Sequence, residues 1–155
     1  MAPKYRLEVL TAEGELYRAD DAEFVVLPGS EGELGVLAHH IPLVVTLSAG
    51  PMTIRLEGGQ EEVLFVGGGF ADISRDGEGE TVVSVLADAG ERASDVDEAA
   101  AEETRRRAQE MLSQKLSDED YIEASAMLER SVGRIRVAEL NRRRRTPRGE
   151  RAMRG

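Results

Sequence analysis

The sequence predicts a β-sandwich N-terminal domain of about ten short strands, followed by a C-terminal antiparallel α-helical hairpin. Up to about residue 90, apolar residues alternate with polar ones or form short runs, and beyond it they recur every three or four positions. Turn residues interrupt the first part at short intervals, as is typical of sandwiches and barrels. We therefore expect a β-sandwich head at residues 1–90, a two-helix hairpin at 91–141 and a basic tail at 142–155, disordered unless an acidic partner orders it.

The expected strands are of two kinds. Alternation over residues 5–9 and 52–57 places the apolar side chains on one face of a strand. Continuous apolar runs suit strands that are buried more deeply, and they occupy residues 24–27, 43–45, 63–66, 82–83 and 85–86. Turns are expected at the dipeptides between these segments: Glu13-Gly14, Pro28-Gly29, Gly50-Pro51, Gly58-Gly59 and Asp76-Gly77.

Near residue 90 the period changes to that of a helix. The segment at 94–97 resembles a capping box, and one helical face follows it: Ala100, Thr104, Ala108 and Leu112. Ser117 with three acids after it repeats the starting signal, and a second narrow stripe follows: Tyr121, Ser125, Leu128, Val132 and Ile135. The break between the two patterns is short, so we expect the helices to fold back on each other.

The hairpin is expected to be detachable. Its two stripes cover each other and bury little more, and a two-helix unit of this size is only marginally stable alone. Gly133 lies inside the second helix, where glycine costs about 1 kcal/mol relative to alanine. We infer that the hairpin docks on the head, or opens and docks elsewhere.

The charge is distributed unevenly along the chain. The formal net charge is -10, yet residues 1–90 hold 5 Lys/Arg against 16 Asp/Glu, while residues 134–155 hold 9 against 2. An acidic body argues against a main surface that binds nucleic acid, and the short Arg142–Arg145 run has no interleaved aromatics. Cysteine is absent, which fits a reducing compartment. No apolar run approaches the roughly 18 residues of a bilayer span, so we expect no direct membrane insertion.

Residues 28–43 hold the two histidines, His39 and His40, beside glycines and acids. Neighbouring residues of a strand point to opposite faces, so the two rings are poorly placed to share a metal, and no metal site is expected. No nucleophile-elbow pattern accompanies them, and the simple interpretation is a loop whose histidine bonds to the backbone. Gly67-Gly68-Gly69 precedes a strand rather than a helix, which favours a turn or bulge over a phosphate-binding loop. Composition and spacing indicate no enzyme, and a protein-interaction role is the default.

The same stretch resembles the epsilon subunit of the rotary proton-translocating ATP synthase. The matching residues are Ser-Glu-Gly-Glu-Leu-Gly-Val-Leu at 30–37 and His-Ile-Pro-Leu at 40–43. Ala38-His39 stands where that family usually has Pro-Gly, and Ile41 stands in place of alanine. The resemblance continues in order through Gly50, Gly68-Gly69-Phe70, and residues 82–88, 95–99 and 120–140.

The resemblance implies a non-catalytic subunit of the central stalk. Such a subunit binds the gamma subunit, rests on the ring of c subunits and couples rotation of that ring to gamma. Its C-terminal helices can rise along gamma into the catalytic alpha/beta hexamer and block ATP hydrolysis. The implied location is the cytoplasmic face of the bacterial cell membrane, where the subunit is held peripherally through the complex.

The resemblance also implies two sets of contact residues. Glu33 and His40 match positions at the base of the sandwich that face the c-ring loops, and Glu31 lies in the same loop. An acidic loop of the catalytic beta subunits faces the inserted helix in this family. The candidates for that inhibitory contact are Arg136, Arg142, Arg143, Arg144 and Arg145.

Some bacterial members bind ATP in the folded-down hairpin, which gives an alternative function, an ATP-sensing module whose hairpin is held down by nucleotide. Asp97 begins the corresponding motif, but Ala100 occupies its arginine position. The remaining candidates are Arg107, Arg130 and Arg134, whose guanidinium groups suit phosphate oxygens. The competing interpretation is salt bridging on a helix surface. Apart from ATP as a regulatory ligand, no cofactor is expected.

Overall fold

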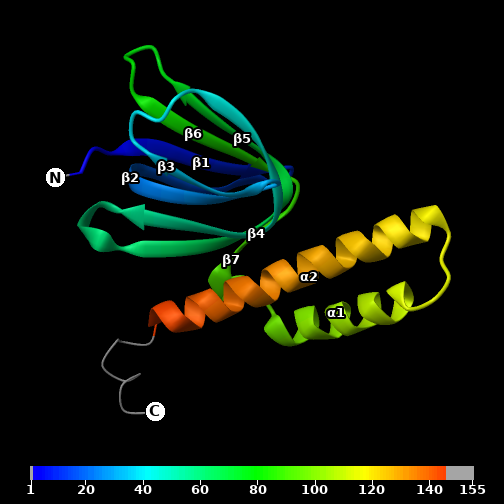
Figure 1. Ribbon diagram of the computed structural model, residues 1–155. Helices are drawn as coiled ribbons and strands as arrows, with labels where there is room; N and C mark the ends of the chain where they lie inside the picture. Colours follow the sequence, from blue (N-terminus) through cyan, green and yellow to red (C-terminus); the bar gives the residue numbers. More distant parts are fainter. Residues whose placement is uncertain (1, 146–155) are drawn as a thin grey trace.

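The computed structural model describes residues 2–145 and shows a β-sheet head with a helical hairpin lying along one side of it (Figure 1). Within this range the head forms seven strands and two short 3-10 turns. The strands are β1 (Tyr5–Thr11), β2 (Gly14–Gly29), β3 (Gly32–Leu37), β4 (Leu43–Leu56), β5 (Glu61–Arg75), β6 (Thr81–Ala87) and β7 (Gly90–Arg92). The 3-10 turns are η1 (Glu57–Gly59) and η2 (Ala93–Asp95).

The sheet closes on itself. The strand order is β1-β6-β5-β4-β2-β3, and β1 also pairs with β2, so the sandwich is a flattened barrel. β1 runs parallel to β6, and the other pairings are antiparallel. The expected sandwich is confirmed. The strands are fewer and longer than expected because Gly50-Pro51, predicted as a turn, lies inside β4, where these residues pair with Val66 and Phe65 of β5.

Strand β5 bends at the glycine run and thereby serves two neighbours. Before the bend Val66 pairs with Gly90 of β7, and after it Gly69 pairs with Ala87 of β6. Gly69 has a φ of 116°, and a Cβ placed there would lie 2.0 Å from the carbonyl oxygen of Leu86. Only glycine fits such a position. The glycine run nevertheless lies inside a continuous strand whose register with β4 does not shift there, so the expected turn or bulge is wrong.

Two apolar clusters hold the molecule together. The main core fills the barrel and includes the fully buried Leu7, Leu27 and Ile54. At its edge the buried Tyr5 hydroxyl donates to the carbonyl oxygen of Val36 at 2.6 Å, and burial raises the pKa of this tyrosine. The second cluster is small and lies where the hairpin meets the head, and its buried members are Val63, Phe65, Ala93 and Val137.

The hairpin consists of α1 (Glu98–Leu112) and α2 (Asp118–Arg145). Asp97 caps α1 by accepting a hydrogen bond from the Ala100 amide at 3.0 Å. The N-cap therefore lies three residues after Ser94, where the capping box was expected to begin. Ser117 accepts from the Asp120 amide at 3.2 Å, as its starting signal predicted. α2 packs against β4 and β5, and α1 packs against α2 (Figure 1).

The buried faces of the helices differ in part from the predicted ones. In α1, Ala108 is buried as expected, but Ala101 is buried in place of Ala100. In α2, the predicted Tyr121 and Val132 are 58% and 47% exposed. Positions between the expected ones and beyond the last of them are buried instead, and they are Ala124, Ser131, Gly133, Val137, Ala138 and Asn141. The reason is that α2 contacts two neighbours, α1 and the head, whereas the prediction assumed one.

Both expected domain boundaries shift. β7 and η2 follow residue 90, yet β7 pairs with β5 and Ala93 belongs to the second cluster, so the head extends past residue 90. α2 continues through Arg145, so the first four residues of the predicted tail are helical. Residues 146–155 of that tail lie outside the described residues. None of the helices in the described part is both long and apolar enough to cross a membrane.

Candidate functional site

The three predicted head residues lie at two ends of β3. Glu31 is exposed in the turn between β2 and β3, and Glu33, with its side chain 60% exposed, is the second residue of β3 and pairs with Pro28. His40 follows the far end of the same strand, half-buried, in the loop to β4. A six-residue strand is about 20 Å long. The structure therefore brings Glu31 and Glu33 together but separates them from His40.

The histidine loop is built on backbone hydrogen bonds. The Nδ1 atom of His40 lies 2.7 Å from the carbonyl oxygen of Ile41, which confirms the expected backbone bond. The amide of His39 donates to the Thr81 hydroxyl at 2.9 Å, and Arg75 donates to the His39 carbonyl at 3.4 Å. The described residues contain no cluster of three or more metal-ligating side chains.

His39 adopts the left-handed backbone conformation, with a φ of 67°. Among the non-glycine residues that the structure describes, it is alone in having a positive φ. This conformation costs a residue with a side chain about 1 kcal/mol or more. The geometry thus accounts for the usual glycine at this position in the family that the sequence resembles.

Beside this loop the head exposes apolar side chains, which we call the outer patch: Leu37, Ile41, Val44, Phe70 and Leu86. Phe70 and Leu86 are direct cross-strand neighbours on β5 and β6, and Val44 lies diagonally across from Phe70 on β4. All five side chains are more than half exposed. Exposed apolar side chains that adjoin one another, as Val44, Phe70 and Leu86 do, are typical of an interaction site. The outer patch was not expected from the sequence, because runs such as 85–86 suit strands that are buried more deeply.

The predicted inhibitory arginines pair within the chain. Arg136 lies 3.4 Å from Glu33, and Arg142 pairs with Glu98 at the start of α1. Hydrogen bonding to Glu98 raises the pKa of Arg142. Arg143 and Arg145 are exposed. Exposed ion pairs contribute about 0–1 kcal/mol each, so these contacts are easily exchanged for others.

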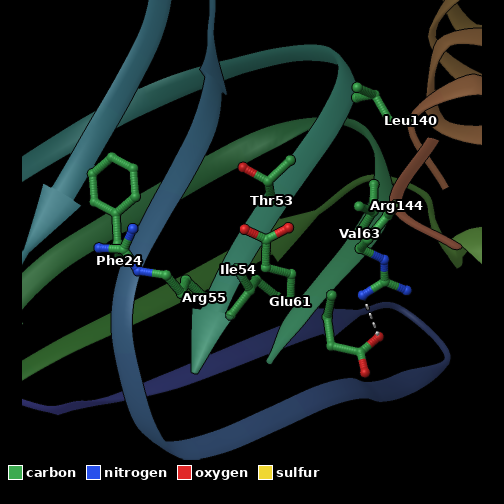
Figure 2. A pocket seen from close by; sticks show the side chains of 9 residues that line it. Phe24, Thr53, Ile54, Arg55, Glu61, Val63, Leu140 and Arg144 are labelled. Carbon is green, nitrogen blue, oxygen red and sulfur yellow. Dashed lines mark ion pairs between the residues drawn. The ribbon is translucent and has the colours of Figure 1, made fainter. Parts of the chain in front are cut away.

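The fourth of these arginines, Arg144, points into a pocket between the end of α2 and the β4–β5 hairpin (Figure 2). Its Nη1 atom lies 3.9 Å from Glu62, and its Nη2 atom donates to Asn141 at 3.2 Å. The pocket has a volume of about 310 Å³. Arg55 and Glu61 also line it, so two arginines face two glutamates and the charges balance. This pocket thus shows no preference for an anion.

The contact between α2 and the head is narrow but specific. Glu129 accepts a hydrogen bond from the Ala49 amide at 3.4 Å. One turn later the guanidinium of Arg134 lies 4.9 Å from the centre of the Phe65 ring and 2.6 Å from Glu91. Val137 then inserts into the second cluster and is fully buried. We call these contacts, together with Gly133 between them, the seam.

The residues predicted to bind ATP either make other contacts within the chain or line different pockets. Asp97 caps α1, and Arg134 is held in the seam. Arg107 lines a surface pocket on α1, whereas Arg134 lines a different pocket beside Glu91. Arg130 is half-buried on α2. ATP binding stays a prediction, and these contacts do not favour it.

Comparison with known proteins gives a consistent result over nearly the whole chain. The family model described as the ATP synthase delta/epsilon chain, beta-sandwich domain, matches residues 4–93. The model described as the ATP synthase delta/epsilon chain, long alpha-helix domain, matches residues 94–139. The border between them lies within η2, close to the boundary in the structure.

Individual relatives agree with the family models. The ATP synthase epsilon chain of Chromohalobacter salexigens is 41% identical over 133 residues, which cover 86% of this chain and 90% of that one. The ATP synthase epsilon chain 2 of Ralstonia nicotianae is 43% identical over 143 residues, which cover 92% of this chain and 99% of that one.

Two solved structures share the fold. A chain of the Euglena gracilis mitochondrial ATP synthase structure (OSCP/F1/c-ring) has a TM-score of 0.73 at 22% identity, and the match covers 86% of this chain and 81% of that one. A chain of the Tetrahymena thermophila mitochondrial ATP synthase structure (central stalk/c-ring) has a TM-score of 0.61 at 14% identity. That match covers 88% of this chain and 98% of the other.

Proposed function

The chain belongs to the delta/epsilon family of ATP synthase subunits, and from this premise we propose that it is a non-catalytic rotor subunit with a regulatory hairpin. Its head transmits rotation between the c-ring and gamma, and its helices regulate ATP hydrolysis in the alpha/beta hexamer. The bacterial relatives named epsilon chain support a location at the cytoplasmic face of the cell membrane, held through the complex.

The seam is the observation that carries the regulatory part of the proposal. The head has its own core, and the hairpin joins it through a second cluster to which α2 contributes one fully buried apolar side chain, Val137. Burying such a side chain contributes only about 1.5–3 kcal/mol. The exposed Arg136–Glu33 ion pair adds little. An interface of this strength can be exchanged for another one at moderate free-energy cost.

Partner contacts of the head follow from the two ends of β3. At one end, His40 adjoins the outer patch, an apolar surface that suits a lasting interface with gamma, so we assign His40 to gamma and not to the c-ring loops that the resemblance implied. At the other end, Glu31 and Glu33 offer exposed carboxylates to polar c-ring loops. Each end is thus proposed to contact a different neighbour. Crosslinking from residue 33 and from residue 40 in intact complexes tests this: the two positions are expected to label different subunits, and identical products would contradict the assignment.

The arginines of α2 provide the proposed inhibitory contact. In the docked hairpin Arg136 and Arg144 face Glu33 and Glu62 of the head. Release of α2 frees these guanidinium groups for carboxylates on the beta subunits, which they can bind in the same way. The docked and inhibitory states thus compete for the same charges.

Reconstitution tests the proposal. Full-length chain and a chain that ends at Val96, which keeps β7 and η2, are each added to a complex that lacks this subunit. Both are expected to bind purified gamma in size exclusion, since the head is intact, but only the full-length chain is expected to slow ATP hydrolysis. Equal hydrolysis rates with both chains would contradict the inhibitory role. Failure of both chains to bind gamma at micromolar concentration would contradict the rotor role.

A further inference from the structure

A single glycine lies where α2 crosses the head. Gly133 is buried within α2, and a Cβ placed on it would lie 3.1 Å from Cε2 of Phe65 and 3.2 Å from the amide nitrogen of Gly50. Carbon atoms in good contact are about 3.5–4.0 Å apart. A side chain at this position would therefore crowd Phe65 and the β4 backbone, and these neighbours or α2 itself would have to shift by a few tenths of an ångström.

The close approach at Gly133 supports the contacts on both sides of it. Glu129 reaches the Ala49 amide one turn before it, and Val137 enters the second cluster one turn after it. Arg134, the next residue, stacks on Phe65. A shift of the helix axis at residue 133 would lengthen all of these contacts at once, because they lie along one rigid helix.

The same glycine is unfavourable for the helix itself. Glycine is disfavoured relative to alanine in a helix interior by about fivefold in equilibrium terms. This disadvantage is present whether the hairpin is docked or released. The benefit of the missing side chain exists only in the docked state, where Phe65 and the β4 backbone lie against it.

We propose that Gly133 sets the balance between the docked and the released hairpin, by permitting the backbone contact that the docked state alone requires. The regulatory meaning of this balance rests on the proposed function. The balance itself is a property of the isolated chain. A side chain at 133 acts with opposite signs on two quantities: it strengthens the helix and weakens docking.

The experiment measures docking in the full-length chain by fluorescence energy transfer. The sequence has no cysteine, so Glu78→Cys in the β5–β6 loop and Gln114→Cys in the hairpin turn, both exposed positions, accept the two dyes. Gly133→Ala is expected to raise the ratio of released to docked hairpin about fivefold or more, which is the usual effect of overpacking, and Gly133→Val is expected to raise it further. Helix content by circular dichroism should not fall for the alanine variant.

Ile122→Ala is the matched control. It also replaces a residue of lower helix propensity by alanine on α2, but Ile122 is 67% exposed. We expect the same energy transfer as in the unaltered chain. A change as large as that of Gly133→Ala would mean that helix propensity, not close approach, governs docking, and would overturn the proposal.

A second-site variant keeps the test decisive if Gly133→Ala disturbs folding. Phe65→Leu removes the ring atom nearest to the new Cβ, so in combination with Gly133→Ala it should release less hairpin than the two single effects multiplied. Fully independent effects, or unchanged docking in Gly133→Ala and Gly133→Val, would refute the proposal. A variant that shifts docking without altering hydrolysis in the complex would leave this inference standing and reject the inhibitory role instead.

Discussion

The substitution Val137→Ala, which removes two methyl groups from the seam, should weaken docking of the hairpin without lowering the stability of the head. Val137 is completely buried, with 0% of its surface exposed. It belongs to the second cluster, with Val63 and Phe65, and not to the barrel core. Each buried methylene contributes about 0.8 kcal/mol, and the cavity that remains adds to the loss. Val137→Ala should therefore weaken docking by about 2 kcal/mol, close to a 30-fold change in the docked-to-released ratio.

Native-state hydrogen exchange separates docking from global stability. In Val137→Ala we expect faster exchange of the amides of α2 and of β5 near Phe65, with unchanged protection of β1 and β6 in the barrel. Val132→Ala is the matched control, because it is the same chemical change on the same helix at a side chain that is 47% exposed. If both variants exchanged alike, or if the barrel lost protection together with α2, the view of the seam as a separate, weak interface would be wrong.

Three further predictions concern the head. His39→Val should lower the free energy of unfolding in urea by about 1 kcal/mol because a β-branched residue fits a positive φ poorly, whereas His39→Gly should not lower it. Tyr5→Phe should cost about 1–2 kcal/mol in the same assay, since the buried carbonyl of Val36 loses its donor. Asp76 has a pKa held below its ordinary value by the amides of Glu80 and, less strongly, Glu78. Its contribution to stability should therefore be present above about pH 4 and be lost as the pH falls through the folded pKa, and acid unfolding of Asp76→Ala should lack this component.

The elements and their order could be predicted from the sequence because they depend on local patterns. Alternation identifies β1, and the acids after Ser117 mark the start of α2. What failed depends on contacts between distant segments. Gly50-Pro51 has the composition of a turn, but strand β5 pairs with both residues and keeps β4 continuous. A local pattern contains no information on that pairing.

For the candidate site, too, the local properties of single residues could be predicted, but their positions relative to one another could not. The exposed Glu33 and the backbone-bonded His40 agree with expectation, but their separation along β3 becomes clear only from the boundaries of that strand. From the sequence, Gly133 was expected only to destabilise the helix. Its favourable effect on docking depends on the close approach of Phe65, which is 68 positions away in the sequence. The pairing of Arg136 with Glu33 likewise joins residues that sequence spacing could not relate.

The parallel pairing of β1 with β6 has a consequence for biosynthesis. The first strand of the chain finds one of its two neighbours only in residues 82–86, so a nascent polypeptide emerging from the ribosome cannot close the barrel until that late segment has been translated. Until then the edge of β1 that β6 later covers has unpaired backbone groups, which favour association with other chains. We therefore expect stalled or truncated translation products that end before residue 82 to be prone to aggregation, while those that end after residue 96 fold into a closed head.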